Sequence, residues 1–188
     1  DGVIGTSTLT QNGIFKTDSN GEIRISNLAP GAYVLTEIKS LPGYVMDSPS
    51  TNVVIGTNGD TQTVVVTNTP KGGLLIRKTD GVTGAPLPGV KFKIIAANGE
   101  LIPDNEGLTS SNGLYTTDEN GQIYLRKLNP NTYVVSEVET IDGYLLNAAP
   151  QTVVVSEADT QVLSFTNMPL GGLLVKKMDS ATKEPLAD

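Results

Sequence analysis

The chain has 188 residues and a formal net charge of -7 at pH 7, from 20 acidic and 13 basic side chains. It has no cysteine and no histidine, which excludes disulfides, thiol nucleophiles, histidine-based catalytic triads and the usual zinc ligand sets. The acidic balance argues against binding to nucleic acid or to an anionic membrane, and no apolar run in the sequence approaches the roughly 20 residues of a membrane span.

The first half of the chain alternates short apolar segments with turn residues. KTDSNGEIRISNL (16–28) places Asn-Gly between alternating residues, which is typical of a tight hairpin turn. It is followed by three segments rich in strand-forming residues: AYVLTEIKSLPGY (32–44), VVVTNTPKGGLLIRKTD (64–80) and GVKFKII (89–95). We therefore expect antiparallel strands and no helix.

The second half repeats the first at a domain-sized period. TTDENGQIYLRKL begins at 116, 100 residues after its counterpart at 16, and LSFTNMPLGGLLVKKMD ends at 179, 99 residues after its counterpart ends at 80. The period predicts three segments. Residues 1–70 are the C-terminal two thirds of a first repeat, residues 71–170 are a complete repeat, and residues 171–188 are the opening strand of a third.

The leading segment lacks counterparts of two strands of the complete repeat, GGLLIRKTD and GVKFKII. Their loss would expose the apolar faces of its remaining strands, so we expect this segment to be unstable alone. Two interpretations follow. The chain is a window on a longer array, or its tail from Gly171 supplies a first strand to the head of a neighbouring molecule.

The pattern gives about seven short strands per repeat, with turn residues at intervals of roughly 8 to 12 residues. This spacing predicts an all-β protein made of tandem antiparallel β-sandwich domains, of immunoglobulin-like or prealbumin-like type. Spacing alone does not distinguish these two topologies.

Three predicted strands each end an apolar row with a polar side chain. Because side chains alternate between the faces of a strand, three core-facing rows can be read from the sequence: Leu74, Ile76 and Lys78; Tyr133, Val135 and Glu137; Leu163, Phe165 and Asn167. Burying a lone amine, carboxyl or amide costs several kcal/mol, so these groups are tolerable in a core only where they meet one another.

Such a meeting would change the chemistry of the groups. Burial lowers the pKa of a lysine amine and raises the pKa of a carboxyl, which leaves a neutral, nucleophilic amine beside a protonated acid. Lys78 could then attack the Asn167 side-chain amide, with Glu137 donating to the carbonyl oxygen and shuttling protons as ammonia leaves. The plainer interpretation is a semi-buried Lys-Glu pair with an Asn in the following turn.

The order and spacing of four motifs, GGLLIRKTDGVTGAPLPGVKFKI, TTDENGQIYLRKLNPNTY, YVVSEVETIDGY and LSFTNMP, resemble Cna B-type or SpaA-like prealbumin-fold repeat domains of Gram-positive surface adhesins and pilins. The resemblance covers essentially the whole chain. It implies an intramolecular isopeptide bond between Lys78 and Asn167, with Glu137 as the catalytic acid. Alternation along the strand would place Glu139 on the same face as Glu137, which makes it a second candidate for the acid. The family motif, however, aligns with Glu137.

The resemblance also assigns residues in the two incomplete repeats. Glu37 and Asn68 match the acid and the amide in the leading repeat, and Lys177 matches the lysine in the trailing repeat. Lys177 would react with partners beyond residue 188, or alternatively with Asn68 of a neighbouring chain.

Together these features predict structural stalk or shaft repeats of an extracellular, cell-wall-anchored Gram-positive surface protein. The expected partners are neighbouring repeats, head-to-tail neighbours by strand complementation, and a host ligand elsewhere in the protein. We expect no cofactor, no metal, and no enzyme activity beyond a single-turnover self-modification. The alternative function is a ligand-binding adhesion module that recognises host protein or glycan through loops at one end of the sandwich. TDSNGE and TDENGQ faintly resemble calcium loops, but a turn explains the same residues.

Overall fold

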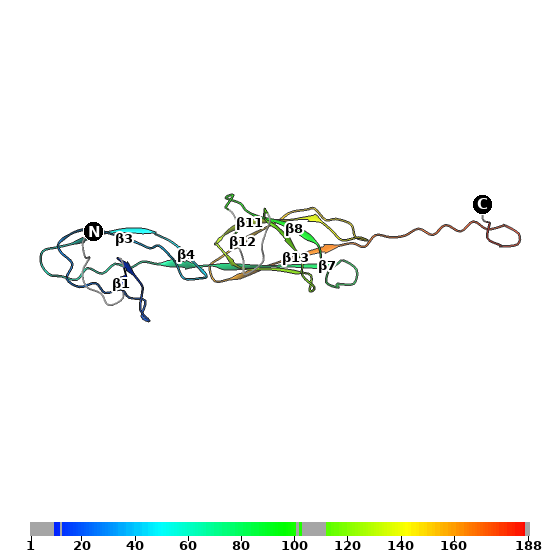
Figure 1. Ribbon diagram of the computed structural model, residues 1–188. Coiled ribbons are helices and arrows are strands. Elements are labelled where there is room, and N and C mark those ends of the chain that lie inside the picture. Colours follow the sequence, from blue (N-terminus) through cyan, green and yellow to red (C-terminus); the bar gives the residue numbers. More distant parts are fainter. Residues whose placement is uncertain (1–9, 12, 101, 103–111, 187–188) are drawn as a thin grey trace. The chain divides into compact units, whose positions relative to one another are not determined.

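The structure is a computed structural model that describes residues 10–11, 13–100, 102 and 112–186. The chain divides into two compact units, which we call unit 1 (Asp1–Thr69) and unit 2 (Pro70–Asp188). The described residues form strands and contain no helix (Figure 1). It follows that none of them lies in a helix long and apolar enough to cross a membrane.

The described residues of unit 2 form two sheets, as the predicted all-β sandwich requires. The three-stranded sheet has the order β10-β7-β13, with β10 at Gln122–Leu128, β7 at Gly72–Asp80 and β13 at Thr160–Asn167. The four-stranded sheet has the order β12-β11-β8-β9, with β12 at Gln151–Val155, β11 at Asn131–Glu139, β8 at Lys91–Ala96 and β9 at Leu114–Thr116.

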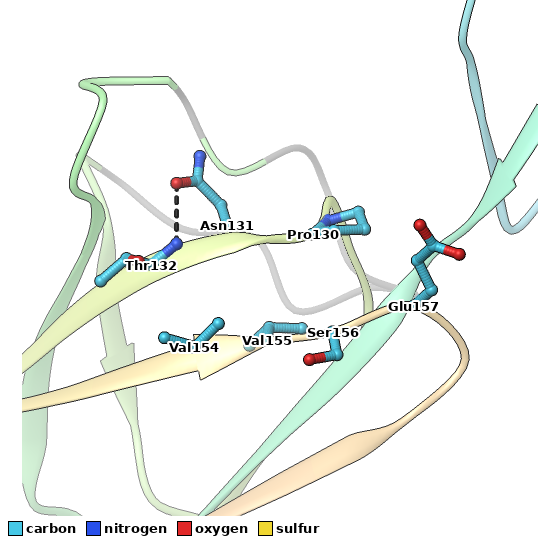
Figure 2. A pocket seen from close by; sticks show the side chains of 7 residues that line it. All are labelled: Pro130, Asn131, Thr132, Val154, Val155, Ser156 and Glu157. Atoms are coloured by element: carbon cyan, nitrogen blue, oxygen red, sulfur yellow. Dashed lines mark hydrogen bonds between the residues drawn. The ribbon is translucent and has the colours of Figure 1, made fainter.

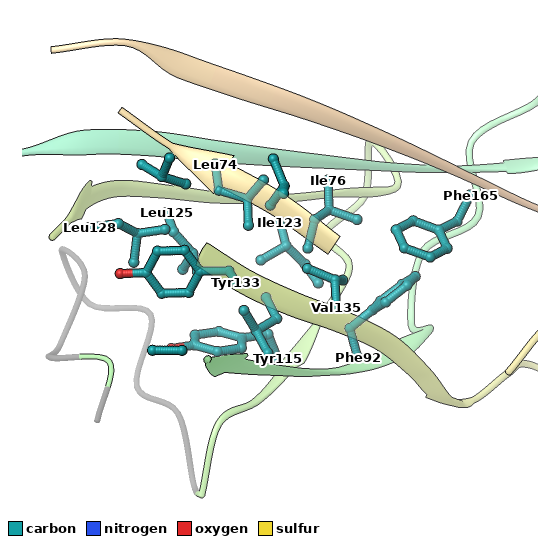
Figure 3. Packing of buried hydrophobic residues seen from close by; sticks show 14 of the residues in the cluster. Leu74, Ile76, Phe92, Tyr115, Ile123, Leu125, Leu128, Tyr133, Val135 and Phe165 are labelled. Carbon is teal, nitrogen blue, oxygen red and sulfur yellow. The ribbon is translucent and has the colours of Figure 1, made fainter. Parts of the chain in front are cut away.

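The core of unit 2 lies between these two sheets. Side chains of β7 such as Leu74 and Ile76 point toward Tyr133 and Val135 of β11 (Figure 3). Burial alternates along both strands, as expected where one face of each strand packs on a core. Near one end of the core, Phe92 and Phe165 pack edge to face, with ring centroids 4.9 Å apart.

One strand pairing differs from the antiparallel expectation. The first strand, β7, and the last strand, β13, are parallel, with Gly73 opposite Thr160 and Asp80 opposite Asn167. A hairpin cannot join parallel strands. Here the rest of the unit separates them in sequence, so neither local pattern nor turn type indicated the direction of pairing.

The predicted Asn-Gly hairpin is also wrong in its pairing. A tight turn does form, because the Asp118 carboxylate accepts hydrogen bonds from the backbone N–H groups of Asn120 (2.9 Å) and Gln122 (2.8 Å). Gly121 alone takes the positive φ, at 68°. The strands on either side, β9 and β10, belong to different sheets, so the turn passes the chain between sheets.

Unit 1 contains three described two-stranded sheets. They pair β1 (Thr10–Gln11) with β2 (Ile14–Phe15), β3 (Gly31–Thr36) with β5 (Ser50–Ile55), and β4 (Tyr44–Met46) with β6 (Asn68–Pro70). None of the side chains of residues 13–69 is fully buried.

Hydrogen bonds to the Asp80 carboxylate connect the end of β7 to the segment after β11. Asp80 accepts hydrogen bonds from the backbone N–H groups of Thr83 (2.8 Å) and Val82 (2.7 Å), and from the Tyr144 hydroxyl (2.7 Å). These bonds favour the ionised form, and they lower the pKa of Asp80 to about 2, with the Thr83 N–H contributing most and the Tyr144 hydroxyl next.

Val135 tests the importance of the core between the sheets. Val135 is completely buried, whereas Val154 in the same sheet is 61% exposed. We expect Val135→Ala to lower the free energy of unfolding of unit 2 by about 2 kcal/mol, since it removes buried methyl groups and leaves a cavity. Val154→Ala is the matched control and should change it by less than about 0.5 kcal/mol. Urea unfolding followed by circular dichroism measures both, and equal effects would contradict this packing.

The Asp80 site predicts a pH-dependent stability. Since its pKa is lowered in the folded state, its contribution is fully present above the ordinary pKa of 3.8 and is lost as the pH falls through about 2. Tyr144→Phe removes one hydrogen-bond donor to the Asp80 carboxylate, so it should lower the free energy of unfolding at pH 7. This loss relative to the wild type should shrink between pH 4 and pH 2. Urea unfolding at several pH values measures this. Tyr124→Phe, which loses only a hydroxyl contact to Thr160, should show no such trend. A Tyr144→Phe deficit that stays constant down to pH 2 would refute the assignment.

Candidate functional site

Three polar side chains lie buried at one end of the unit 2 core. Lys78 comes from β7 and Asn167 from β13 in one sheet, whereas Glu137 comes from β11 in the other. Lys78 is 0% exposed, and Glu137 and Asn167 are each 1% exposed. The alternation of each strand turns its polar residue inward, and the two sheets bring the residues together across the core.

Glu137 is within reach of both other groups. The Lys78 Nζ atom lies 3.9 Å from Glu137 Oε2. The Asn167 Nδ2 group donates a hydrogen bond of 2.5 Å to Glu137 Oε1. Glu137 therefore stands between the amine and the amide and contacts each through a different carboxyl oxygen.

Several polar atoms of this cluster lack hydrogen bonds. Lys78 Nζ, Glu137 Oε2 and Asn167 Oδ1 are buried and have no hydrogen-bond partner. Such atoms are costly in a folded protein and call for an explanation, of which a chemical role is one. Burial lowers the pKa of the Lys78 amine, and the negative charges of Glu137 and Asp80 oppose this effect only partly. The amine is thus shifted toward its neutral, nucleophilic form.

Apolar neighbours exclude water from the cluster. Phe165 is opposite Lys78 in the β13–β7 pairing, and Phe92 is opposite Glu137 in the β8–β11 pairing. Both phenyl side chains are buried. A low-dielectric wall of this kind strengthens electrostatic interactions inside the site and penalises the charged amine.

The amide is oriented differently from the sequence-based expectation. We expected Glu137 to donate to the carbonyl oxygen of Asn167. In the structure Glu137 instead accepts a hydrogen bond from Nδ2, which is the nitrogen that leaves when an amine replaces it. Glu137 therefore lies beside this nitrogen, and no hydrogen bond from it to the carbonyl oxygen is present.

The sequence interpretation missed one residue of the site. The Thr140 hydroxyl accepts a second hydrogen bond from Asn167 Nδ2, at 2.7 Å. In unit 1 the Ser40 hydroxyl has the same relation to Asn68 Nδ2, at 3.2 Å. A hydroxyl residue three positions after the acid in both repeats was the available signal.

Glu139 is excluded from the cluster. It forms an exposed ion pair with Lys91, whose Nζ lies 2.9 Å from Glu139 Oε1. The pairing of β11 with β8 shifts its register between Glu137 and Glu139. A bulge of this kind breaks the strict alternation of faces. For this reason Glu139 does not share the core-facing side of Glu137, as alternation predicted.

Unit 1 contains part of the same cluster. Asn68 Nδ2 donates a hydrogen bond of 2.8 Å to Glu37 Oε1, while Glu37 Oε2 and Asn68 Oδ1 are buried without a hydrogen-bond partner. No lysine stands beside them in the way that Lys78 stands beside Glu137 among the described contacts. Lys177, the matching residue of the trailing segment, is exposed.

A separate depression of about 570 Å³ lies where β11 begins and β12 ends (Figure 2). Its walls include Pro130, Val154 and Glu157, and the Asn131 side chain accepts a hydrogen bond from the Thr132 backbone N–H (2.7 Å). That amide oxygen is therefore already engaged locally. The described polar groups do not converge there as they do in the Lys78 cluster.

The two segments that faintly resembled calcium loops use their first carboxylate in a turn. Asp18 accepts hydrogen bonds from the backbone N–H groups of Asn20 and Glu22, as Asp118 does in unit 2. Within the described part of the chain, no group of three or more acidic side chains is arranged to hold a metal ion.

Most of the chain is similar to solved pilin structures. No curated protein sequence matches it significantly. Among solved structures it is similar to a minor pilin of Streptococcus agalactiae, with 23% identity, a TM-score of 0.47, and coverage of 86% of this chain and 69% of that one. It is also similar to a streptococcal ancillary pilin, with 27% identity, a TM-score of 0.47, and coverage of 82% of this chain and 46% of the other.

A third similar structure is a double mutant of the shaft pilin SpaA from Lactobacillus rhamnosus GG, at 20% identity and a TM-score of 0.48, with 85% of this chain and 68% of that chain covered. The sequence model of the SpaA prealbumin-like fold domain matches residues 4–70 and 72–169. These ranges include most of the chain and both polar clusters. The chain belongs to the family of SpaA prealbumin-like fold domains.

Proposed function

We propose that this chain is a stretch of the stalk or shaft of a Gram-positive surface adhesin or pilin, strengthened by spontaneous Lys-Asn isopeptide bonds. The observation that supports it most directly is the buried cluster of Lys78, Glu137 and Asn167 on the first, a middle and the last strand of unit 2. The lowered pKa of the Lys78 amine and the contact of Glu137 with both partners suit amide formation better than a passive ion pair.

The reaction exchanges one amide nitrogen for another. The neutral Lys78 Nζ attacks Asn167 Cγ, so that the Nζ–Cγ bond forms and the Cγ–Nδ2 bond breaks. One proton from Nζ passes through Glu137 to Nδ2, which leaves as ammonia, and Glu137 ends in its starting state. Held in one cluster, the two partners react as if unimolecular, which lowers the barrier considerably.

The bond would change how the domain carries tension. Force that enters at Gly72 would pass along β7 to Lys78, cross the new amide to Asn167, and leave the domain there. The residues between positions 78 and 167 would carry little of this tension. A series of such domains would form a stalk that does not extend by unfolding.

The bond would also stabilise the fold against unfolding. It closes a loop of 89 residues, since 167 - 78 = 89, and by analogy with a disulfide it removes about 4 to 5 kcal/mol of unfolded-state entropy. Extracellular domains commonly use disulfides for this purpose, and this chain has no cysteine.

The remaining features fit an extracellular structural role. We infer that neighbouring repeats of the same protein are the chief partners and that the chemistry is a single self-modification with no turnover. We place the protein on the outside of the cell wall, where pilins and adhesins act. Any host ligand is bound elsewhere in the protein.

The intact mass of the protein tests the proposal. The 188-residue wild type should be lighter than its formula mass by at least one ammonia. Lys78→Ala, Glu137→Ala and Asn167→Ala should each abolish the loss that arises in unit 2, which peptide mapping assigns to a Lys78–Asn167 cross-linked pair. A wild-type chain whose Lys78 and Asn167 peptides are unlinked would refute the proposed function.

Matched controls are available in the same sheet as Glu137. Lys91→Ala and Glu139→Ala remove an exposed ion pair between β8 and β11, the strand that also carries Glu137. Both variants should still lose ammonia as the wild type does. If either variant abolished the reaction, the effect of the cluster variants would be explained by a general disturbance of the strands. Removal of the cluster residues would then not be the cause.

The hydrogen bond between Thr140 and Asn167 predicts an effect on the rate of amide formation. Thr140→Val removes the hydroxyl that holds Asn167 Nδ2, and we expect amide formation to slow about fivefold to tenfold, the equivalent of one hydrogen bond. Thr140→Ser should restore the rate. Cell-free synthesis, followed by intact mass at successive times, measures both. Equal rates in Thr140→Val and Thr140→Ser would mean that the hydroxyl has no such role.

A further inference from the structure

Six Asn-Gly pairs occur in the chain, and a pair of this kind can modify itself. The pairs begin at residues 12, 20, 58, 98, 112 and 120. The backbone nitrogen of the glycine can attack the side-chain amide carbon of the preceding asparagine, because glycine has no Cβ to shield that nitrogen. Whether a given pair reacts depends on the contacts of the glycine nitrogen and on how the asparagine amide is held.

In three of these pairs a hydrogen bond occupies the glycine nitrogen. The N–H group donates to a backbone carbonyl three residues earlier: Gly21 to Asp18 (3.1 Å), Gly99 to Ala96 (2.9 Å) and Gly121 to Asp118 (2.9 Å). Such an N–H group must give up its bond before it can lose its proton and attack. The pairs at 12 and 112 include or adjoin residues outside the described part of the chain, so the comparison is with the pair at 58.

The glycine nitrogen of the Asn58–Gly59 pair, in the turn after β5, is available for attack. Among the described contacts, no hydrogen bond occupies the Gly59 N–H group. Gly59 is exposed to solvent, and its φ of 78° is a conformation that glycine adopts without strain. This nitrogen can therefore lose its proton to water without breaking a hydrogen bond of the turn.

The Asn58 side chain is held by the residue that follows the glycine. The Asp60 backbone N–H donates to Asn58 Oδ1 (3.3 Å), and Asn58 Nδ2 donates to Asp60 Oδ2. The first bond polarises the carbonyl that is attacked and folds the side chain back over the Gly59 peptide. The second places a carboxylate beside the leaving nitrogen, as Glu137 lies beside Asn167 Nδ2 in unit 2.

Asn98 has a similarly held amide but an occupied nucleophile. The Glu100 backbone N–H donates to Asn98 Oδ1 (3.0 Å), and Asn98 Nδ2 donates to Glu100 Oε2 (3.4 Å). The Gly99 N–H, however, donates to the Ala96 carbonyl. The availability of the glycine nitrogen is thus the chief difference between the pairs at 58 and 98.

We propose that Asn58 is a site of spontaneous deamidation, which reacts faster than Asn20, Asn98 and Asn120. The Gly59 nitrogen bonds to Asn58 Cγ and the Cγ–Nδ2 bond breaks. The proton of the Gly59 N–H passes through water to Nδ2, which leaves as ammonia. Water then opens the cyclic imide at one of its two carbonyl carbons, which leaves aspartate or isoaspartate in place of Asn58.

The modification changes the turn after β5. The new carboxylate carries a negative charge beside Asp60 and cannot donate to it, so repulsion replaces the bond from Nδ2. Isoaspartate also lengthens the backbone by one carbon atom. The matching turn of unit 2 contains Glu157 and Ala158 and no Asn-Gly pair, so this reaction distinguishes the two repeats.

The 188-residue protein provides the test. After incubation at pH 7, digestion and mass spectrometry follow the replacement of NH2 by OH at each asparagine, and a methyltransferase specific for isoaspartate identifies that product. Asn58 should convert at least about fivefold faster than Asn98, the equivalent of one hydrogen bond. The rate should rise at pH 9, because the attacking nitrogen must lose a proton. Equal rates at Asn58 and Asn98, or a rate at Asn58 that does not depend on pH, would overturn the proposal.

Three variants examine the parts of the site. Gly59→Ala should slow the conversion about tenfold or more, because a Cβ shields the nitrogen; Ala158 has a φ of 52°, so alanine can adopt the positive φ of this turn. Asp60→Ala retains the backbone donor but removes the carboxylate, and should slow the reaction about twofold to fivefold. Thr57→Ala is the control and should leave the rate unchanged. If Thr57→Ala slowed the reaction as much as Gly59→Ala, general disturbance of the turn would explain both and the proposed roles would be wrong.

Unfolding separates the folded geometry from the local sequence. In concentrated urea, Lys78→Ala, which cannot form the proposed cross-link, should convert Asn58 and Asn98 at similar rates, because the hydrogen bonds of both turns are lost. A difference that persists in urea would assign the effect to neighbouring residue types and overturn the structural argument. The Lys78–Asn167 link is read independently in the wild-type digest. If that link forms but Asn58 converts no faster than Asn98, this inference fails while the proposed function stands.

Discussion

A lysine amine buried between two sheets is the constraint on which the rest of unit 2 depends. The Lys78 amine cannot stay in the core as an isolated charge, because desolvation of an unpaired ion costs several kcal/mol. Glu137 approaches it from the opposite sheet and accepts a hydrogen bond from Asn167, which comes from the strand beside that of Lys78. The parallel pairing of β7 with β13 is what makes this possible, since it places the end of the first strand beside the end of the last.

Several features outside the cluster hold it in place. The bulge after Glu137 turns Glu139 outward to Lys91, so one carboxyl rather than two enters the core. Thr140 engages the side-chain amide of Asn167. Asp80, two residues beyond Lys78, is fastened by backbone N–H groups and by the Tyr144 hydroxyl. These contacts restrict the strand ends, and restriction of this kind brings reacting groups into position before any chemistry occurs.

The two units share part of the polar cluster and differ in the order of their described strands. Both have the acid, the amide and a hydroxyl at matching positions, and in both the amide nitrogen donates to the acid. Among the described residues, β7 of unit 2 supplies hydrogen bonds to neighbours on both sides and aliphatic side chains to the core. In unit 1 the flanking residues 22–25 and 61–67 form no strand. Sheet order here depends on pairing rather than on local propensity.

The sequence by itself determined the all-β class, the period of the repeat and the inward side of Lys78, Glu137 and Asn167. Strict alternation along a strand makes these features local, so they can be read without knowing any partner strand. Only the tertiary structure decided that β7 and β13 are parallel, that the Asn-Gly turn joins two sheets, and that the nitrogen of Asn167 faces Glu137 and Thr140. Each of these depends on contacts between residues far apart in the chain, and the alternating pattern of a single strand carries no information about which strand lies beside it.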